Sequence, residues 1–412
     1  MRTNLDDLIR ANGAIALWVS GAANHNPSMV YLTGGIHLTQ GDLFYIPGQT
    51  PILFHGSMER DEAAKTGYRL ISYSNYDPKA YLSAANGDRA EAMALRYQQM
   101  LEDIGLTQGK VLLYGSREVG RFYSLIKRLQ ELPTGLEFAG DVIDAVLLEA
   151  RATKTPDELE HIRTMGHITT RVVANTLDLL TSQSVVQETL VKANGAPLTI
   201  GDVKAQINLW LSEFGAENPE DTIFAIGRDA GVPHSNGTDS DPIKLGQTIV
   251  YDIYPCEKGG GYFYDFTRTW CLGYAPEEVQ KTYNDVSTTY DTIVSELKTG
   301  VNFNDFQVRT CELFESMGHE TIRQNFKVEN GYVHSLGHGV GLDVHEKPFC
   351  GLPEDSTQTL KPGSVITIEP GLYYPDKGYG IRLEDTYYID ESGAFHKFVD
   401  FPMDLIIPMK RG

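Results

Sequence analysis

Two apolar stretches that read as β-strands each carry an aspartate, and this pair constrains the fold most strongly. Asp252 lies in residues 248–254 and Asp265 in residues 262–270, with three consecutive glycines at 259–261 between them. The pattern predicts two strands joined as a hairpin. A buried aspartate is costly unless something pairs with its charge, so a cation between the strands would stabilise both residues. For either aspartate alone, exposure to solvent is the commoner arrangement.

A second unusual run holds three of the chain's 11 histidines, His334, His338 and His345, within twelve residues. Glycine at every second position from 337 to 341 argues against a helix, and the run lacks the glutamate that follows the first histidine of a zincin motif. Each histidine alone reads as a hydrogen-bonded loop residue. Three together indicate a site, because histidine is the usual metal ligand and proton shuttle.

Two later strand-like stretches carry further charges. Residues 364–369 end in Glu369, and residues 380–389 contain Arg382 and Glu384. Side chains alternate along a strand, so Arg382 and Glu384 are expected on one face of a single strand. Arg382 and Glu384 either form a solvated ion pair, or the acids of these two strands are buried against a cation. The apolar residues around them favour a buried cation.

The four acids Asp252, Asp265, Glu369 and Glu384 with one neutral imidazole would carry four negative charges, which two divalent cations would cancel. This set of groups is typical of a two-metal site that activates a water molecule and polarises a substrate carbonyl. Oxygen-rich ligation with one imidazole suits Mn²⁺, with Co²⁺ and Zn²⁺ as alternatives.

A helix start divides the chain into residues 1–150 and 151–412. Thr155 is a capping residue, Pro156 suits the first helical position, and Glu158 completes a capping box. Before it, apolar runs alternate with helical stretches, which predicts a small α/β domain. The apolar runs are 14–19, 29–32, 42–46 and 111–114, the helical stretches are 88–104 and 116–132, and later helices are expected at 199–214 and 276–297.

The charge excludes some classes of partner. The formal net charge is −20, and residues 151–412 account for −16 of it. Nucleic acids and anionic membrane surfaces bind clustered positive charge, so neither is an expected partner. No stretch approaches the length of a membrane helix, and the four cysteines form no CxxC pair. A cytoplasmic protein with reduced thiols is the default expectation.

Four motifs resemble those of the pita-bread metallopeptidases, the family of aminopeptidase P, prolidase and methionine aminopeptidase. Residues 265–269 read Asp-Phe-Thr-Arg-Thr, residues 368–373 read Ile-Glu-Pro-Gly-Leu-Tyr, and residues 381–385 read Ile-Arg-Leu-Glu-Asp. Residues 334–346 read His-Ser-Leu-Gly-His-Gly-Val-Gly-Leu-Asp-Val-His-Glu. The resemblance implies an α+β pita-bread catalytic domain at 151–412. Residues 1–150 resemble, more weakly, the α/β N-terminal domain of the prolidase, aminopeptidase P and creatinase group.

The resemblance also implies a metal-binding role for five residues. Asp252 would bind one metal, and Asp265 and Glu384 would bridge both. His338 and Glu369 would complete the second site. Glu369 would also move a proton from the attacking hydroxide or water, held between the metals, to the leaving nitrogen.

Five residues would act on the substrate or on the ligands. His345 would stabilise the oxyanion at the scissile carbonyl, His234 would contact the substrate, and His334 would line the pocket for the residue after the cut. Tyr373 and Arg382 would order the site, with Tyr373 also facing the substrate.

One spacing departs from the family. Twelve residues separate Asp252 from Asp265 where the family usually has ten. Because side chains alternate with a period of two, two extra residues leave both aspartates on the same faces of their strands. The metal site is therefore expected to persist, while substrate contacts near 255–261 change.

The expected function is therefore a cytoplasmic, homodimeric metallo-exopeptidase that cleaves peptides with proline at the second position, in the manner of aminopeptidase P. The alternatives are a prolidase restricted to Xaa-Pro dipeptides, a hydrolase of another small amide, and a non-catalytic peptide-binding relative. Creatinase is disfavoured because all five ligand types are present, and methionine aminopeptidase because of the additional N-terminal domain.

Overall fold

The computed structural model describes residues 4–141, 143–351 and 358–410, and the chain forms two compact units. The first unit comprises Met1–Arg151 with Gly259–Gly261, and the second comprises Ala152–Lys258 with Tyr262–Gly412. All four cysteines are buried thiols. No helix of the described residues is long and apolar enough to cross a membrane.

The first unit is built on a six-stranded mixed sheet with the order β4-β3-β2-β1-β5-β6. Its strands are β1 (Ala16–Gly21), β2 (Gly41–Tyr45), β3 (Ile52–His55), β4 (Arg69–Ser72), β5 (Gln108–Ser116) and β6 (Gly135–Ala139). Its helices are α1 (Leu5–Ala11), α2 (Pro27–Thr33), α3 (Arg60–Ala64), α4 (Pro78–Ala84), α5 (Arg89–Asp103), α6 (Val119–Glu131) and α7 (Ala145–Arg151). The predicted α/β character is therefore present.

One of the four apolar runs in this unit belongs to a helix rather than to a strand. Residues 29–32 lie inside helix α2, because Asn26 accepts a hydrogen bond from the Met29 backbone N–H at 3.2 Å and Pro27 occupies the first helical turn. An N-cap asparagine followed by proline is a helix-start signal, and it outweighs the short apolar run.

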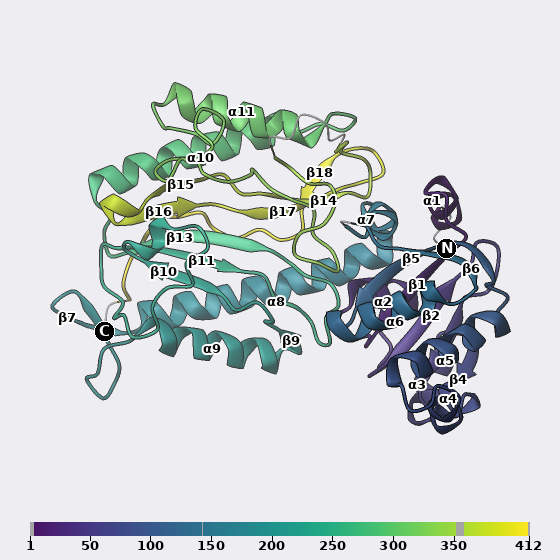
Figure 1. Ribbon diagram of the computed structural model, residues 1–412. Helices are drawn as coiled ribbons and strands as arrows, with labels where there is room; N and C mark the ends of the chain where they lie inside the picture. Colours follow the sequence, from purple (N-terminus) through teal and green to yellow (C-terminus); the bar gives the residue numbers. More distant parts are fainter. Residues whose placement is uncertain (1–3, 142, 352–357, 411–412) are drawn as a thin grey trace. The chain divides into compact units, whose positions relative to one another are not determined.

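The second unit has strands between two pairs of helices, with α8 and α9 on one side and α10 and α11 on the other (Figure 1). Its helices are α8 (Pro156–Thr181), α9 (Ile200–Glu213), α10 (Glu277–Glu296) and α11 (Phe303–Ser316). Its strands are β7 (Ser184–Val186), β8 (Thr189–Val191), β9 (Ala216–Glu217), β10 (Ile223–Ile226), β11 (Thr248–Ile253), β12 (Cys256–Glu257), β13 (Phe266–Leu272), β14 (Val365–Ile368), β15 (Gly371–Tyr374), β16 (Tyr379–Arg382), β17 (Asp385–Ile389), β18 (Phe395–Lys397) and β19 (Ile406–Ile407). The capping box predicted at Thr155 and Glu158 is present at the start of α8.

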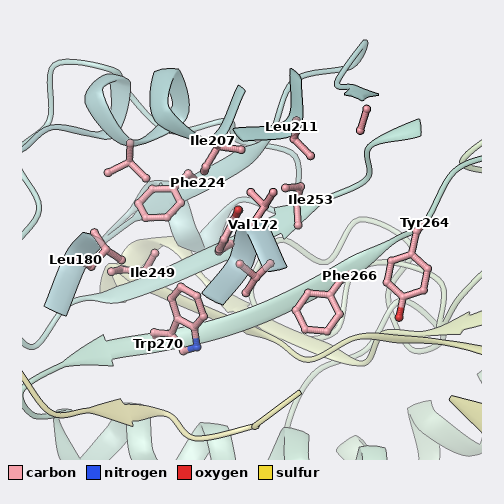
Figure 2. Packing of buried hydrophobic residues seen from close by; sticks show 14 of the residues in the cluster. Val172, Leu180, Ile207, Leu211, Phe224, Ile249, Ile253, Tyr264, Phe266 and Trp270 are labelled. Atoms are coloured by element: carbon pink, nitrogen blue, oxygen red, sulfur yellow. The ribbon is translucent and has the colours of Figure 1, made fainter. Parts of the chain in front are cut away.

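Apolar faces of α8 and α9 pack on the sheet β10-β11-β13-β19. Figure 2 shows Val172 and Leu180 of α8 among side chains of the strands, including Phe224 and Trp270. Burying a side chain of this size contributes roughly 1.5–3 kcal/mol. This packing fixes β11, which carries Asp252, and β13, which directly follows Asp265.

The predicted hairpin is confirmed, with two adjustments. Strands β11 and β13 pair antiparallel, with Asp252 opposite Thr267. Strand β13 begins only at Phe266, so Asp265 immediately precedes it. The connection also contains β12, which pairs with β9 and, through Cys256 and Glu257, with residues 262–263 of the returning segment. A paired loop rather than a tight turn therefore joins the two aspartates.

The single strand expected over residues 380–389 is wrong. Strand β16 ends at Arg382 and pairs with β15, whereas β17 begins at Asp385 and pairs with β14. Between them, the Glu384 N–H donates to the Thr267 carbonyl at 3.1 Å. Pairing with three different neighbours bends the chain here, so the simple alternation of faces does not hold across residues 383–384.

Candidate active site

A cavity of about 380 Å³ in the second unit brings together most of the residues selected from the sequence. Nine of the ten predicted site residues line it: His234, Asp252, Asp265, His334, His338, His345, Glu369, Arg382 and Glu384. The tenth, Tyr373, is fully buried beside them, and its hydroxyl lies 2.8 Å from the Nε2 atom of His334. Six separate segments of the chain thus meet in one place.

Three of these residues form a compact ligand group. One side-chain donor atom from each of Asp265, His338 and Glu384 lies within 4.8 Å of the other two. The Nε2 atom of His338 lies 3.6 Å from Oδ2 of Asp265 and 3.3 Å from Oε1 of Glu369. Four of the predicted ligands therefore surround a common point.

The orientation of His338 suits a ligand. Its Nδ1 atom lies 3.1 Å from the Gly339 carbonyl oxygen, which only accepts hydrogen bonds, so Nδ1 carries the proton. The lone pair of Nε2 then faces the acids. The His338 N–H donates to the Thr367 hydroxyl at 3.1 Å, and the Thr367 N–H donates to the His338 carbonyl at 2.8 Å. These bonds fix the histidine loop beside β14.

Glycine is required in this loop at position 337. A Cβ atom there would lie 2.1 Å from the Thr367 carbonyl oxygen. The glycine-rich spacing that argued against a helix thus allows the backbone of the loop to approach β14 closely.

Buried carboxylate oxygens without hydrogen-bond partners show that the site fits divalent cations. Oδ1 of Asp252, Oδ1 of Asp265 and Oε1 of Glu384 are buried, and none has a hydrogen-bond partner. A buried charged oxygen left unpaired is strongly destabilising. Metal ions are the natural partners for such a set of oxygens with one imidazole.

The pKa values of the buried acids and of His338 also indicate a metal site. Burial, together with repulsion from neighbouring acids, raises the pKa of Asp265 and of Glu384 well above the usual range. Burial also raises the pKa of Glu369 to about 8, with the charge of Asp252 adding to the effect. Burial lowers the pKa of His338 to about 4, so its imidazole is neutral near pH 7.

Arg382 connects the acids to the substrate side of the cavity. It forms a buried ion pair with Asp252, and its Nη1 atom donates to the Tyr373 hydroxyl at 2.8 Å. The Tyr373 hydroxyl can in turn donate to Nε2 of His334, because Nδ1 of His334 lies 2.6 Å from a carbonyl oxygen and carries the proton. The Thr267 hydroxyl donates to Glu384 at 2.7 Å and accepts from Nε of Arg382 at 3.3 Å.

His345 and His234 are the exposed members of the site. The ring centroid of His345 lies 4.2 Å from that of His338, which places it next to the ligand group. His234 follows Pro233, whose carbonyl accepts from Arg382 at 3.3 Å. Both histidines can therefore meet a molecule that enters the cavity.

Several residues in or next to the site were not predicted from the sequence. Glu220, Asn236 and Tyr254 also line the cavity, and Lys154 forms an ion pair with Glu346 next to the histidine loop. Glu220 and Lys154 lie in connecting segments outside the four motifs, so no local pattern marked them. Glu346, an acid inside the histidine motif, was the one residue in the sequence that could have indicated this ion pair.

The family model for metallopeptidase family M24 matches residues 160–391. The chain belongs to this family. The resemblance seen in the four motifs is thus confirmed, and the protein is a hydrolase of peptide bonds. Family M24 enzymes use divalent metal ions, in agreement with the carboxylate group around His338.

Individual M24 relatives agree with this assignment. The Xaa-Pro dipeptidase of Pyrococcus furiosus is 32% identical over 273 residues, which cover 66% of this chain and 70% of the relative. The solved dipeptidase of Pyrococcus horikoshii has a TM-score of 0.77 at 22% identity, covering 98% of this chain and 99% of its own. The solved X-Pro aminopeptidase of Thermotoga maritima has a TM-score of 0.74 at 21% identity, covering 97% and 100%. These structures confirm the predicted combination of an N-terminal α/β domain and a pita-bread catalytic domain.

The raised carboxyl pKa values predict that the metal-free M24 enzyme loses stability as the pH rises. Folded Glu369 holds its proton up to about pH 8, whereas an unfolded glutamate releases it near pH 4.5. Above about pH 6.5 the buried histidines are neutral in both states, so the folded state binds more protons and its free energy of unfolding falls with increasing pH. The melting temperature in a chelator should decrease by several degrees between pH 6.5 and pH 8.

Two comparisons check this prediction. Glu384→Gln removes one of the repelling charges, so it should flatten the decrease, and saturating Mn²⁺ should abolish it. A melting temperature that rises with pH in the chelator would contradict the prediction.

The Lys154–Glu346 ion pair predicts a large effect on stability. Nζ of Lys154 lies 2.6 Å from Oε1 of Glu346, and their side chains are only 2% and 1% exposed. Lys154→Met leaves a buried carboxylate without its cation and should cost about 3–5 kcal/mol. The same substitution at Lys410, whose ion pair with Asp178 is exposed, should cost under about 1 kcal/mol. Denaturant unfolding of both variants provides the measurement, and equal losses would refute the prediction.

Proposed function

We propose that this enzyme is an exopeptidase that hydrolyses the bond between the first residue and a following proline, using two divalent metal ions. The proposed ligands are Asp252, Asp265, His338, Glu369 and Glu384. The observation that carries the proposal is the meeting of these five side chains in one cavity where three carboxylate oxygens lack a partner.

The proposed ligands have distinct positions. Asp265 and Glu384, which share the compact ligand group with His338, would hold the ions together with Asp252 and Glu369. When bound, the ions supply a nucleophilic water near neutral pH and withdraw electrons from the scissile carbonyl. Arg382 holds Asp252, and Thr267 holds Glu384, so both acids are oriented before a substrate arrives.

The remaining residues move protons and stabilise charge. Glu369 would accept the proton of the attacking water and deliver it to the proline nitrogen, which leaves as an amine. His345 would donate a hydrogen bond to the oxyanion that forms on the carbonyl. His334 would contact the proline ring and is held by the buried Tyr373 hydroxyl, and His234 would contact the peptide backbone.

Cleavage of longer peptides is favoured over cleavage of dipeptides alone. A strict dipeptidase has to recognise the free carboxylate of its substrate. Among the described residues of the cavity wall, Arg382 is the single arginine or lysine, and its charge is already paired with Asp252. The relatives include both types, since one is named an Xaa-Pro dipeptidase and another an X-Pro aminopeptidase.

Rates on matched substrates test the proposal. Ala-Pro and Ala-Pro-Ala, incubated with the purified enzyme and Mn²⁺, should show faster release of alanine from the tripeptide. Cleavage of the dipeptide alone would make the enzyme a prolidase. Cleavage of neither, with turnover of another small amide, would support the third function considered from the sequence. Manganese as the native metal, the homodimer and the cytoplasmic location remain predictions.

A further inference from the structure

One carboxylate on the cavity wall stands outside the proposed ligand set. The wall carries five acids among its described residues, and four of them are the proposed metal ligands Asp252, Asp265, Glu369 and Glu384. The fifth is Glu220, which lies between β9 and β10. Two divalent ions would cancel the four ligand charges, so Glu220 adds negative charge that the metal centre does not use.

Glu220 is placed to act on a molecule in the cavity. Its side chain is exposed and forms no hydrogen bond or ion pair with any described residue. Its charge nevertheless acts on His345 and on Tyr254, which line the same cavity. Since His345 is the residue proposed at the scissile carbonyl, the carboxylate lies on the part of the wall that a substrate's first residues occupy.

The exposure of Glu220 distinguishes between two possible cationic groups. The α-ammonium of a substrate is one carbon away from the scissile carbonyl, so it would lie close to the proposed ligands Asp265 and His338, which are buried. Glu220 is exposed, and an exposed carboxylate is better reached by a long side chain. Lysine and arginine carry their charge on such a chain.

We propose that Glu220 is a specificity-determining residue that favours substrates whose first residue is lysine or arginine. This inference rests on the proposed exopeptidase function. An exposed carboxylate–ammonium pair on the wall of a cavity should increase kcat/KM about fivefold over an uncharged side chain of equal length.

Two peptides that differ by one ammonium group provide the test. Lys-Pro-Ala and norleucine-Pro-Ala have side chains of nearly the same length, and kcat/KM is measured for both with the metal-loaded enzyme. The wild-type enzyme should prefer the lysine peptide about fivefold. Glu220→Gln should bring the ratio close to one without changing the rate on norleucine, and Glu220→Lys should reverse the preference. Glu213→Gln, an equal change of net charge in α9 outside the cavity wall, should keep the wild-type ratio.

The outcomes separate this inference from the proposed function. If the norleucine peptide is cleaved and the ratio is the same in the wild-type enzyme and in Glu220→Gln, the role of Glu220 is refuted while the exopeptidase function stands. An equal slowing of both peptides in Glu220→Gln would place the carboxylate at the α-ammonium and would also refute the inference. If neither peptide is cleaved by the wild-type enzyme, both the function and the inference fail.

Discussion

Asp265→Asn should abolish binding of the two proposed metal ions and lower kcat by roughly a thousandfold, because the substitution deletes the negative charge while preserving the shape of the side chain. Oδ1 of Asp265 is buried without a hydrogen-bond partner, and Oδ2 lies 3.6 Å from Nε2 of His338. An amide at this position cannot supply two anionic oxygens to the ligand group. Elemental analysis should therefore show a fall from two metal ions per chain, in parallel with the loss of turnover.

The control for this variant is Asp305→Asn, the same chemical change on the exposed face of α11. It should retain both metal content and activity. Circular dichroism would show that each variant is folded. Full activity of the wild-type enzyme after complete removal of metal would refute the mechanism itself, whatever the variants show.

His345→Ala should lower kcat by about a hundred- to a thousandfold while metal content stays unchanged. The expected size is that of losing one hydrogen-bond donor to an oxyanion. His345 lies beside His338 at a ring-centroid distance of 4.2 Å, but it is not part of the compact ligand group. Since its bond to substrate strengthens only in the transition state, KM should change far less than kcat.

His396→Ala is the matched control, because this histidine lies on β18, is exposed and does not line the cavity. It should leave kcat unaltered. Loss of metal from His345→Ala would show that this residue is a ligand rather than an oxyanion donor. An unchanged kcat with metal retained would show that it has no role in the reaction.

The sequence allowed much of the second unit to be predicted, because its signals are local. The capping box at Thr155 and Glu158 marks the start of α8, and the apolar stretches around Asp252 and Asp265 indicate the hairpin. Features that depend on contacts between distant parts of the chain were not predicted. The break at Glu384 arises because that residue pairs with Thr267, more than a hundred positions earlier in the chain.

The same distinction applies to the candidate site. Residues inside the motifs, such as His338 and Glu369, could be selected by type and order and do lie in one cavity. Glu220 and Lys154 could not, because their importance depends on what lies next to them in space. A carboxylate in a loop is ordinarily solvated, and only the cavity distinguishes Glu220 from the other acids of this acidic chain.

The ion pair between Lys154 and Glu346 also limits how the polypeptide can be shortened. The proline that opens α8 is an inviting place to begin a recombinant fragment containing the catalytic half alone. Such a fragment would lack Lys154, which precedes the helix, and Glu346 would remain buried next to His345 without its cation. Fragments that begin at residue 152 keep the lysine, so the four residues that precede Pro156 would separate a stable catalytic fragment from a destabilised one.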